Sequence, residues 1–475
     1  LPAYIKAFPR IMELEDTQYL WRKGALSIPD TTLRNELIKC YIQHVHPSLP
    51  LINLSDFLQG FGKGGSEVAK TSLLLFQALM FAGTAYIDLS YLQTAGYSTR
   101  RDARTAFYQK TRLLYDFDFE VDRLTVVQSL LLMTYQHETP IDGKDEWHWL
   151  GIAISLIYTT GLHMDPQIYN MDVQNQRLRK RVWWSCVMRD RLLALGMRRP
   201  SRINDGDYNV PMLAIDDFEI KPLESHNLIF SSECRLVSDT TLQKELALIF
   251  ISKAELCLCI GHILSTQYTS LVRDQGMEPD QEGEQGSRVN LFPKPLTKAD
   301  GVNFCEAKLT NWLEKLPAPC RYVTQTPNDL QQRGSSLIIE RAVLHMVYFS
   351  ASTTLHRPQI MPSRESSLCH YRDLQEISWK RLREASEEIT KISMDLHNLE
   401  VTRYLPATGV TILLTAITTH LLDIKITNNI TRKEQARQGL SDCIQSLEEL
   451  RDNYRPADDA IRFVGIALRQ VDIDV

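Results

Sequence analysis

The sequence lacks the cysteine spacings that mark small metal-bound or disulfide-bonded domains. It has nine cysteines, an odd number, and no two of them stand in a Cys-x-x-Cys pair. Neither a structural zinc site nor a disulfide framework is therefore predicted. We expect most of them to be small buried side chains, as in a protein of a reducing compartment. They are Cys40, Cys186, Cys234, Cys257, Cys259, Cys305, Cys320, Cys369 and Cys443.

Long uncharged segments are also scarce, and no signal peptide is visible. The longest uncharged run, residues 405–422, reads LPATGVTILLTAITTHLL and contains five threonines and a histidine. This polarity favours a buried core helix over a membrane span, so no membrane partner is expected.

Basic residues are not in excess. The 475-residue chain has 53 Lys and Arg against 58 Asp and Glu, which gives a formal net charge of −5. A domain that grips DNA by itself is usually basic, so this chain is not expected to be the part that contacts DNA. A hydrophobic content of 44% is ordinary for a globular protein, and the length suits two packed lobes.

Motifs that carry catalysis or metal binding are few. The segment GFGKGG at residues 60–65 matches G-x-G-x-x-G, but no convincing strand precedes it, so a loop is predicted. Asp205, Asp207 and Asn209 have the spacing of a calcium loop, yet Val210 stands where such a loop needs glycine. No constellation of acids and bases is evident, so neither an enzyme nor a metal site is expected.

Isolated histidines are interpreted in the same way. His44 and His46 stand near one helix end, but their i, i+2 spacing does not place them on one helical face. His163 follows Gly161, a glycine that is expected to cap a helix. Each of the three is predicted to be a helix-end or core histidine.

Helical periodicity dominates, and runs of alternating strands are lacking, so an all-α fold is predicted: a large multi-helix bundle of two packed lobes without significant sheet. We expect a lead-in over 1–35, a signature lobe over 36–215 and a C-terminal helical lobe over 216–475, in which 273–297 has a disordered composition. Helices are predicted near 31–45, 67–87, 99–116, 122–137, 145–160, 174–195, 240–272, 298–315, 336–356, 372–397, 407–426, 431–451 and 457–470.

The segment 179–213, RKRVWWSCVMRDRLLALGMRRPSRINDGDYNVPML, is the most informative. Its first half is a helix that is apolar nearly all the way round, which indicates burial. Arg189, Asp190 and Arg191 nevertheless lie inside this helix. Because an unpaired buried charge costs several kcal/mol, we expect these charges to be paired or to face a polar cavity.

This segment resembles the fungal-specific transcription factor domain of zinc binuclear-cluster regulators, especially those of the cutinase transcription factor type. The resemblance rests on the Trp-Trp helix, Asp-Arg, the Gly-x-x-Arg-Pro turn and the D-x-D-x-x-V-P exit. Residues 41–51, 149–153, 161–163, 309–317 and 355–358 resemble further motifs of the family, the later ones more loosely.

The resemblance implies a nuclear regulator of RNA polymerase II transcription that binds DNA through an N-terminal zinc module. The six clustered cysteines of that module are absent here, so we expect a fragment, with no cofactor of its own and zinc only in the missing part. The transcription machinery and possible homodimerisation complete the expected partners.

Apolar and aromatic residues around the signature segment form the candidate ligand site. Plain core packing is the alternative for each of them, but helical proteins also place mostly apolar pockets between helices. Arg189 could bind an acidic head group, because guanidinium binds carboxylate bidentately, or it could be satisfied by Asp190, Asp205 or Asp207. The candidate residues are Trp147, Tyr158, His163, Trp183, Met188, Arg189 and Met197.

Two classes of function remain open alongside an all-α enzyme, which is disfavoured. In the first, the domain senses a hydrophobic inducer such as a fatty acid or lactone. In the second, it is a ligand-free scaffold for dimerisation or auto-inhibition, which predicts a dry core and a large apolar surface patch.

Overall fold

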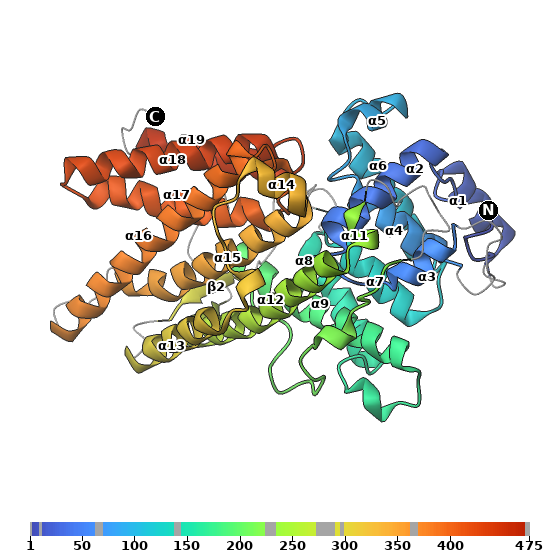
Figure 1. Cartoon of the computed structure of the whole chain (residues 1–475), viewed down its shortest axis with the longest axis horizontal. Helices are drawn as coiled ribbons and strands as arrows, with labels where there is room; N and C mark the ends of the chain where they lie inside the picture. The colour runs from blue at the N-terminus through green and yellow to red at the C-terminus, as the bar shows by residue number, and fades with distance from the viewer. Residues whose placement is uncertain are drawn as a thin grey trace.

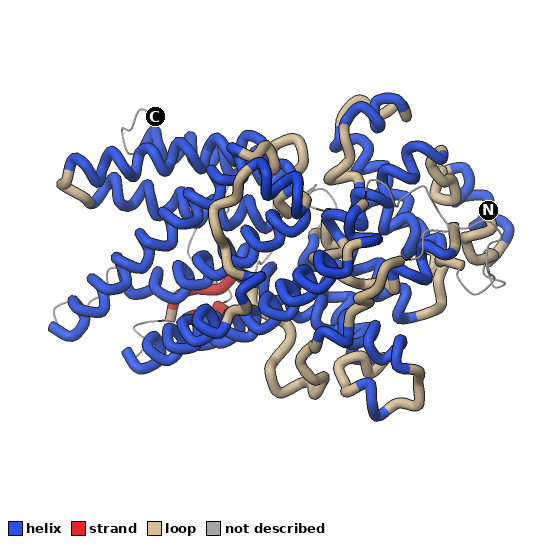
Figure 2. The backbone as a smooth tube through the Cα atoms, in the orientation of Figure 1, coloured by secondary structure: helices blue, strands red, loops and turns tan. Residues whose placement is uncertain are grey.

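The computed structural model of the chain describes residues 2–8, 12–61, 70–136, 144–223, 234–271, 290–294, 299–361 and 369–470. Within these residues the regular structure is almost entirely helical, so the predicted all-α class is confirmed (Figure 2). Residues 62–65 of the glycine-rich segment lie outside the described part of the chain.

The helices before residue 200 are α1 (Leu14–Arg22), α2 (Thr31–Cys40), the π-helix η1 (Tyr41–Val45), α3 (Leu54–Gln59), α4 (Leu73–Gly83), α5 (Leu89–Thr94), α6 (Arg100–Asp116), α7 (Arg123–Met133), α8 (Glu146–Thr159), η3 (Pro166–Ile168) and α9 (Val173–Met197). Those after it are η4 (Ile215–Asp217), α11 (Arg235–Ser238), α12 (Thr240–Gln267), α13 (Ala299–Lys315), η5 (Ala318–Cys320), α14 (Pro327–Arg333), α15 (Ser335–His356), η6 (Arg357–Ile360), α16 (Cys369–Asn398), η7 (Thr402–Tyr404), α17 (Thr408–Ile426), α18 (Ile430–Leu450) and α19 (Arg455–Gln470).

Side-chain caps explain where many of these helices begin. Asp30 accepts hydrogen bonds from two amides at the start of α2, and Asp122, Asp145, Asp172 and Asp239 cap α7, α8, α9 and α12 in the same way. A carboxylate satisfies amides that have no partner within the helix and suits the positive end of the helix dipole. The helices begin at these caps, close to the starts predicted from periodicity.

Helix α12 joins the two halves of the molecule. In Figure 1, α1–α9 lie at one end of the long axis, α15–α19 lie toward the other, and α12 runs between them. It packs on α9 on one side and on α13 and α15 on the other. Because the core is one hydrophobic cluster from Ile5 to Val464, the division at residues 215/216 stays a prediction.

One expectation is wrong in part. Residues 273–297 were predicted to be disordered from their composition, but Asn290–Pro293 forms strand β2, which pairs antiparallel with β1 (Tyr268–Leu271). The amide of Leu291 also donates to the carbonyl of Arg198, 2.7 Å away, at the end of α9. The short apolar stretch of β2 therefore finds partners that a composition average over the whole segment conceals.

Among the described residues, two helices, α12 and α17, are long and apolar enough to cross a membrane by length and composition alone. In each, 61% of the most apolar window is buried inside the protein, as in core helices of globular domains. The uncharged run at 405–422 largely coincides with α17, which packs against α9, α15, α16, α18 and α19.

Candidate ligand-binding site

Two of the three charges inside the signature helix α9, Asp190 and Arg191, are paired with each other, as predicted for buried charges. Arg191 Nη1 lies 2.9 Å from Asp190 Oδ2 and 2.7 Å from the carbonyl oxygen of Ile203. Asp190 in turn accepts the amides of Arg202 and Ile203 at 3.0 and 3.2 Å. The Asp-Arg pair thereby fixes the turn that follows the helix.

Arg189 is satisfied in a different way. Its Nε donates to Thr134 Oγ1 at 2.8 Å, its Nη2 donates to the Thr134 carbonyl at 2.5 Å, and its guanidinium lies 5.2 Å from the centre of the Tyr135 ring. Asp190 and Asp205, two of the carboxylates considered as its partners, instead bind Arg191. The head-group role of Arg189 stays a prediction.

The other predicted site residues fall into three places. Trp147 is half-buried beneath the guanidinium groups of Arg202 and Arg199, 3.4 and 4.8 Å from its ring centre. Tyr158 and His163 contact each other, with ring centres 4.8 Å apart. The third place is the core, where Trp183 and Met188 are buried and Met197 packs on its edge.

Several of these residues carry buried polar atoms without a hydrogen-bond partner in the described structure. They are Trp147 Nε1, Tyr158 Oη, His163 Nδ1 and Trp183 Nε1. Such atoms usually bind water or a ligand, because a buried donor without a partner is costly. Unpartnered atoms alone do not show that a ligand binds there, so the predicted site stays a prediction.

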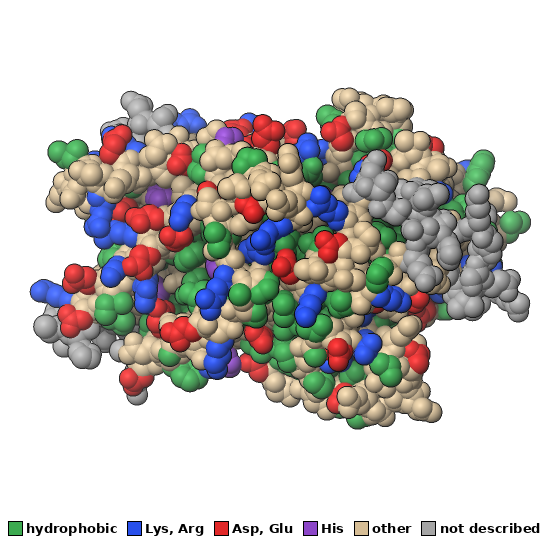
Figure 3. Space-filling view, viewed as in Figure 1, with side chains coloured by type: hydrophobic (Ala, Val, Ile, Leu, Met, Phe, Trp, Pro, Cys, Tyr) green, Lys and Arg blue, Asp and Glu red, His purple; other side chains and the backbone are tan. Residues whose placement is uncertain are grey.

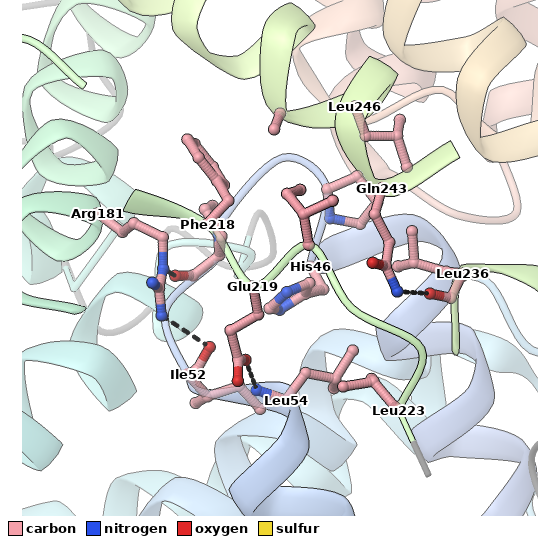
Figure 4. Close-up of a pocket in the computed structure, with 14 residues that line it drawn as sticks. His46, Ile52, Leu54, Arg181, Phe218, Glu219, Leu223, Leu236, Gln243 and Leu246 are labelled. Carbon is pink, nitrogen blue, oxygen red and sulfur yellow. Dashed lines mark hydrogen bonds between the residues drawn. The ribbon is translucent and has the colours of Figure 1, made fainter. Parts of the chain in front are cut away.

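A chamber lies elsewhere, at the junction of the N-terminal helices with the start of α12 (Figure 4). It is partly open to solvent and has a volume of about 60 Å³. None of the seven predicted residues lines it. Its walls are mostly apolar and are formed by His46, Pro47, Pro50, Ile52, Leu54, Arg181, Phe218, Glu219, Ile220, Leu223, Leu236, Gln243, Leu246 and Ala247.

Arg181 holds the segments of the wall together. Its guanidinium, buried at 3% exposure, donates to the carbonyls of Pro50, Ile52 and Asp217 at 3.2, 3.4 and 2.6 Å, and to Asn53 Oδ1 at 2.6 Å. Burial lowers the pKa of Arg181 to about 10, which still leaves the group charged at neutral pH. This one side chain of α9 thus fixes the loop after η1 against the segment at 217.

Two further polar side chains in the wall have structural partners. Glu219 Oε2 accepts the amide of Leu54 at 2.6 Å, at the start of α3. Gln243 Nε2 donates to the carbonyls of Lys221 and Leu236 at 3.0 and 2.8 Å, and Gln243 Oε1 accepts the Lys221 amide at 2.9 Å. Figure 4 shows the bonds from Glu219 to Leu54, Arg181 to Ile52 and Gln243 to Leu236.

His46 is the exception. It follows η1 directly, so the predicted position at a helix end is confirmed, and its ring points into the chamber (Figure 4). Burial, and to a lesser degree the charge of Arg181, lowers its pKa to about 3, so the ring is neutral at physiological pH. Its buried Nδ1 has no hydrogen-bond partner in the described structure.

A second, more polar hollow of about 280 Å³ shares part of this wall. The two have Arg181, Phe218, Glu219 and Ile220 in common. Residues of the connection after α9 therefore face both hollows. The remaining lining consists of Asn53, Gln174, Arg177, Ile215, Asp216 and Lys221.

Sequence reasoning missed this chamber because its residues come from separate segments. The stretch 46–50, His-Pro-Ser-Leu-Pro, was recognised only as a family motif, and the connection at 218–223 carried no motif. The available signal was the pair of prolines after a helix end, which rules out a continued helix and exposes backbone carbonyls. The partner of those carbonyls, Arg181, lies about 130 residues away.

The helical fold and the chamber define an all-α domain with an apolar pocket between its helices. In the described residues no group of three or more His, Cys, Asp or Glu side chains is placed to hold a metal ion. Residues 38–314 match the fungal specific transcription factor domain, and the chain belongs to this family.

Similar proteins are transcription regulators rather than enzymes. The chain is 46% identical over its whole length to Cutinase transcription factor 1 beta of Fusarium vanettenii, of which it covers 54%. It is 34% identical over 99% of its length to Transcription factor cpaR of Aspergillus oryzae, of which it covers 77%. Over 86% of its length it is 25% identical to an Acetamidase regulatory protein of Aspergillus fumigatus, of which it covers 45%. The chain thus spans about half the length of most of these relatives.

Proposed function

We propose that this chain is the effector-sensing part of a nuclear transcription factor, and that a hydrophobic small molecule such as a fatty acid or lactone binds at the chamber. DNA binding through an N-terminal zinc module, control of RNA polymerase II transcription and contact with the transcription machinery belong to the same proposal. Membership of the family and the names of the relatives support it.

The observation that carries the sensing role is the composition of the chamber wall. Residues of the N-terminal half, such as Pro50 and Ile52, face Leu246 and Ala247 of α12 across an apolar space. Helix α12 also packs on α15 of the C-terminal half. A ligand that fills this space would therefore stabilise one packing of the two halves over others, as a ligand does when it prefers one conformation.

Thermal unfolding of the purified chain with a panel of fatty acids, esters and lactones tests the proposal. A ligand at about one hundred times its Kd adds about 2.7 kcal/mol of stability, which raises the midpoint by about 3 °C for a chain of this length. We expect a saturable shift confined to one chemical class. A flat panel with a well-folded protein would contradict the sensing role.

Two variants locate the response. Ala247→Leu fills the chamber and should abolish the shift, whereas Lys244→Leu, on the exposed side of the same helix, should retain it. Tyr158→Phe tests the site predicted around the signature segment. A shift that Tyr158→Phe abolishes and Ala247→Leu leaves intact would place the ligand there and not in the chamber.

A dimerisation scaffold remains the second candidate, and one feature favours it. Helix α19 exposes Phe463 and Ile466, at 52% and 48%, one turn apart on the same side. On the face shown in Figure 3, however, hydrophobic side chains are interspersed with charged ones. Sedimentation of the wild type and of Phe463→Ser distinguishes a dimerisation scaffold from a ligand sensor. Only the scaffold predicts a dimer that dissociates when Phe463 is replaced.

A further inference from the structure

We infer that the chamber takes a neutral, hydrogen-bonding apolar molecule, an alcohol, ester or lactone and not a carboxylate, with His46 as the group that binds its polar atom. This inference rests on the proposed sensing role and narrows the chemical class of the ligand. It follows from a comparison of the polar side chains in the wall: some already form hydrogen bonds within the protein, and one has a ring nitrogen that is free in the described structure.

The charged and amide groups of the wall have little left to offer a ligand. Arg181 is engaged through all three of its nitrogen atoms, mainly by main-chain carbonyls. Gln243 is held at both ends of its amide by main-chain groups. To bind a carboxylate, Arg181 would have to release the carbonyls that shape the chamber, leaving them buried without donors.

His46 is the polar side chain of the wall that has a buried atom without a hydrogen-bond partner among the described residues. It lines the chamber, and its buried Nδ1 has no hydrogen-bond partner in the described part of the chain. A neutral imidazole has one donor and one acceptor nitrogen. It therefore suits a hydroxyl, which can do both, or the carbonyl of an ester or lactone, which accepts.

Charge and size point the same way. The Glu219 carboxyl group already lies in the wall, so a ligand carboxylate would bring a second acid into an apolar space. The enclosed volume of about 60 Å³ is well below the roughly 150 Å³ of an engineered cavity that binds benzene. Only a short part of an aliphatic chain, or the end of a larger molecule, fits this space without rearrangement.

Three probes with the same six-carbon chain test this inference at pH 7.5: hexan-1-ol, methyl hexanoate and sodium hexanoate. Affinity is measured by saturation-transfer NMR of the probe and by the midpoint of thermal unfolding. We expect saturable binding of the alcohol and the ester that Ala247→Leu removes, and binding of hexanoate at least tenfold weaker. The inference is overturned if hexanoate binds as tightly as the alcohol and Ala247→Leu abolishes this binding. The sensing role would still stand.

A matched pair of histidine variants tests the role of His46. Loss of one neutral hydrogen bond weakens binding about fivefold, so His46→Phe should weaken hexan-1-ol binding by that factor. His44→Phe, two residues away and outside the chamber, should leave it unchanged. Equal affinities in wild type and His46→Phe overturn the inference. If His46→Phe does not fold, the selectivity of the wild type among the three probes decides alone.

If none of these probes binds and the larger panel of fatty acids, esters and lactones is also without effect, both the inference and the sensing role fail. If only members of the larger panel bind at the chamber, preference of an ester over its parent acid supports the inference. The reverse preference contradicts it.

Discussion

Two neutral histidines are built into the region around η1. His44 stacks on Tyr404, with ring centres 4.4 Å apart and planes 3° from parallel, and His46 faces the chamber. Burial lowers the pKa of each to about 3, with a smaller effect from a nearby arginine. The sequence allowed both to be interpreted as helix-end or core residues, but their surroundings come from segments far along the chain.

These two histidines should make folding stability depend on pH. An unfolded histidine has a pKa of about 6.5, so below that pH the unfolded chain binds protons that the folded chain does not. Above pH 6.5 each neutral histidine makes its full contribution to the free energy of unfolding. Below pH 6.5 this contribution falls by about 1.4 kcal/mol per pH unit for each histidine as the pH drops towards 3. Urea unfolding at pH 7.5 and 5.5 should show a smaller loss in His44→Phe than in the wild type.

Tyr404→Phe is the control, because it keeps the stacked ring but removes no titrating imidazole. It should show the same dependence on pH as the wild type. If the pH dependence in His44→Phe is the same as in the wild type, the pKa of His44 is the same in the folded and the unfolded state.

The limits of sequence reasoning at this scale are clear from α9. The charges of Arg189, Asp190 and Arg191 were predicted to be paired or to face a polar cavity, because charges in an apolar helix need partners. The partner of Arg189 was sought among nearby carboxylates, yet it is Thr134, 55 residues earlier. A hydroxyl and a main-chain carbonyl leave no charge signature in the sequence, so only the packing of α7 on the adjoining helices reveals them.

Most helices pack through an apolar face. Apolar residues therefore recur along the sequence with the helical period, and this made the helices predictable. Each range predicted to be helical contains a helix of the structure, with ends that differ by a few residues. The short helices α1, α3, α5, α11 and α14 were missed. Four to nine residues give too few turns for a period of 3.6 to stand out.

The crossing of α2 and α4 depends on a glycine. A Cβ atom on Gly83 would lie 2.5 Å from the carbonyl oxygen of Leu37, which is main chain and cannot rotate away. Gly83→Ala should therefore force the two helices apart and lower the free energy of unfolding by about 1–3 kcal/mol.

The matched substitution is Gly465→Ala in α19, where a Cβ would meet nothing within 4 Å. Alanine has the higher helix propensity, so this change should raise the free energy of unfolding by about 0.5–1 kcal/mol. Urea unfolding curves of the two variants should shift in opposite directions. A neutral Gly83→Ala would indicate that α2 is free to move.

A buried ion pair lies where the two halves of the molecule meet. Lys253 of α12 lies 2.8 Å from Glu340 of α15, and both side chains are at most 5% exposed. Ser48, in the loop after η1, donates to the other carboxylate oxygen. Three segments far apart in the sequence thus depend on one carboxylate.

Glu340→Gln should destabilise the protein by about 3–5 kcal/mol, because the charge of Lys253 would remain buried without a counter-ion. The double variant Lys253→Met/Glu340→Met removes both charges and should lose clearly less. Urea unfolding of the single and double variants gives the coupling between the two residues. Additive losses would show that the pair acts as two independent groups.

At the scale of the whole molecule, the all-α class and the family followed from the sequence, because periodicity and local motifs determine both. The chamber did not follow, because it exists only where η1, the connection after α9 and the start of α12 converge. Motif searches read one segment at a time and cannot detect such a site. The polar residues that shape it are also ordinary in type and spacing.

The hairpin of β1 and β2 has a consequence for how members of this family can diverge. Pairing of Tyr268 with Pro293 and of Leu271 with Asn290 fixes the distance between the two ends of the intervening segment. The entropy cost of closing such a connection grows only slowly with its length. Insertions and deletions between the strands should therefore accumulate through evolution without disturbing the helices, whereas the strands themselves should keep their length.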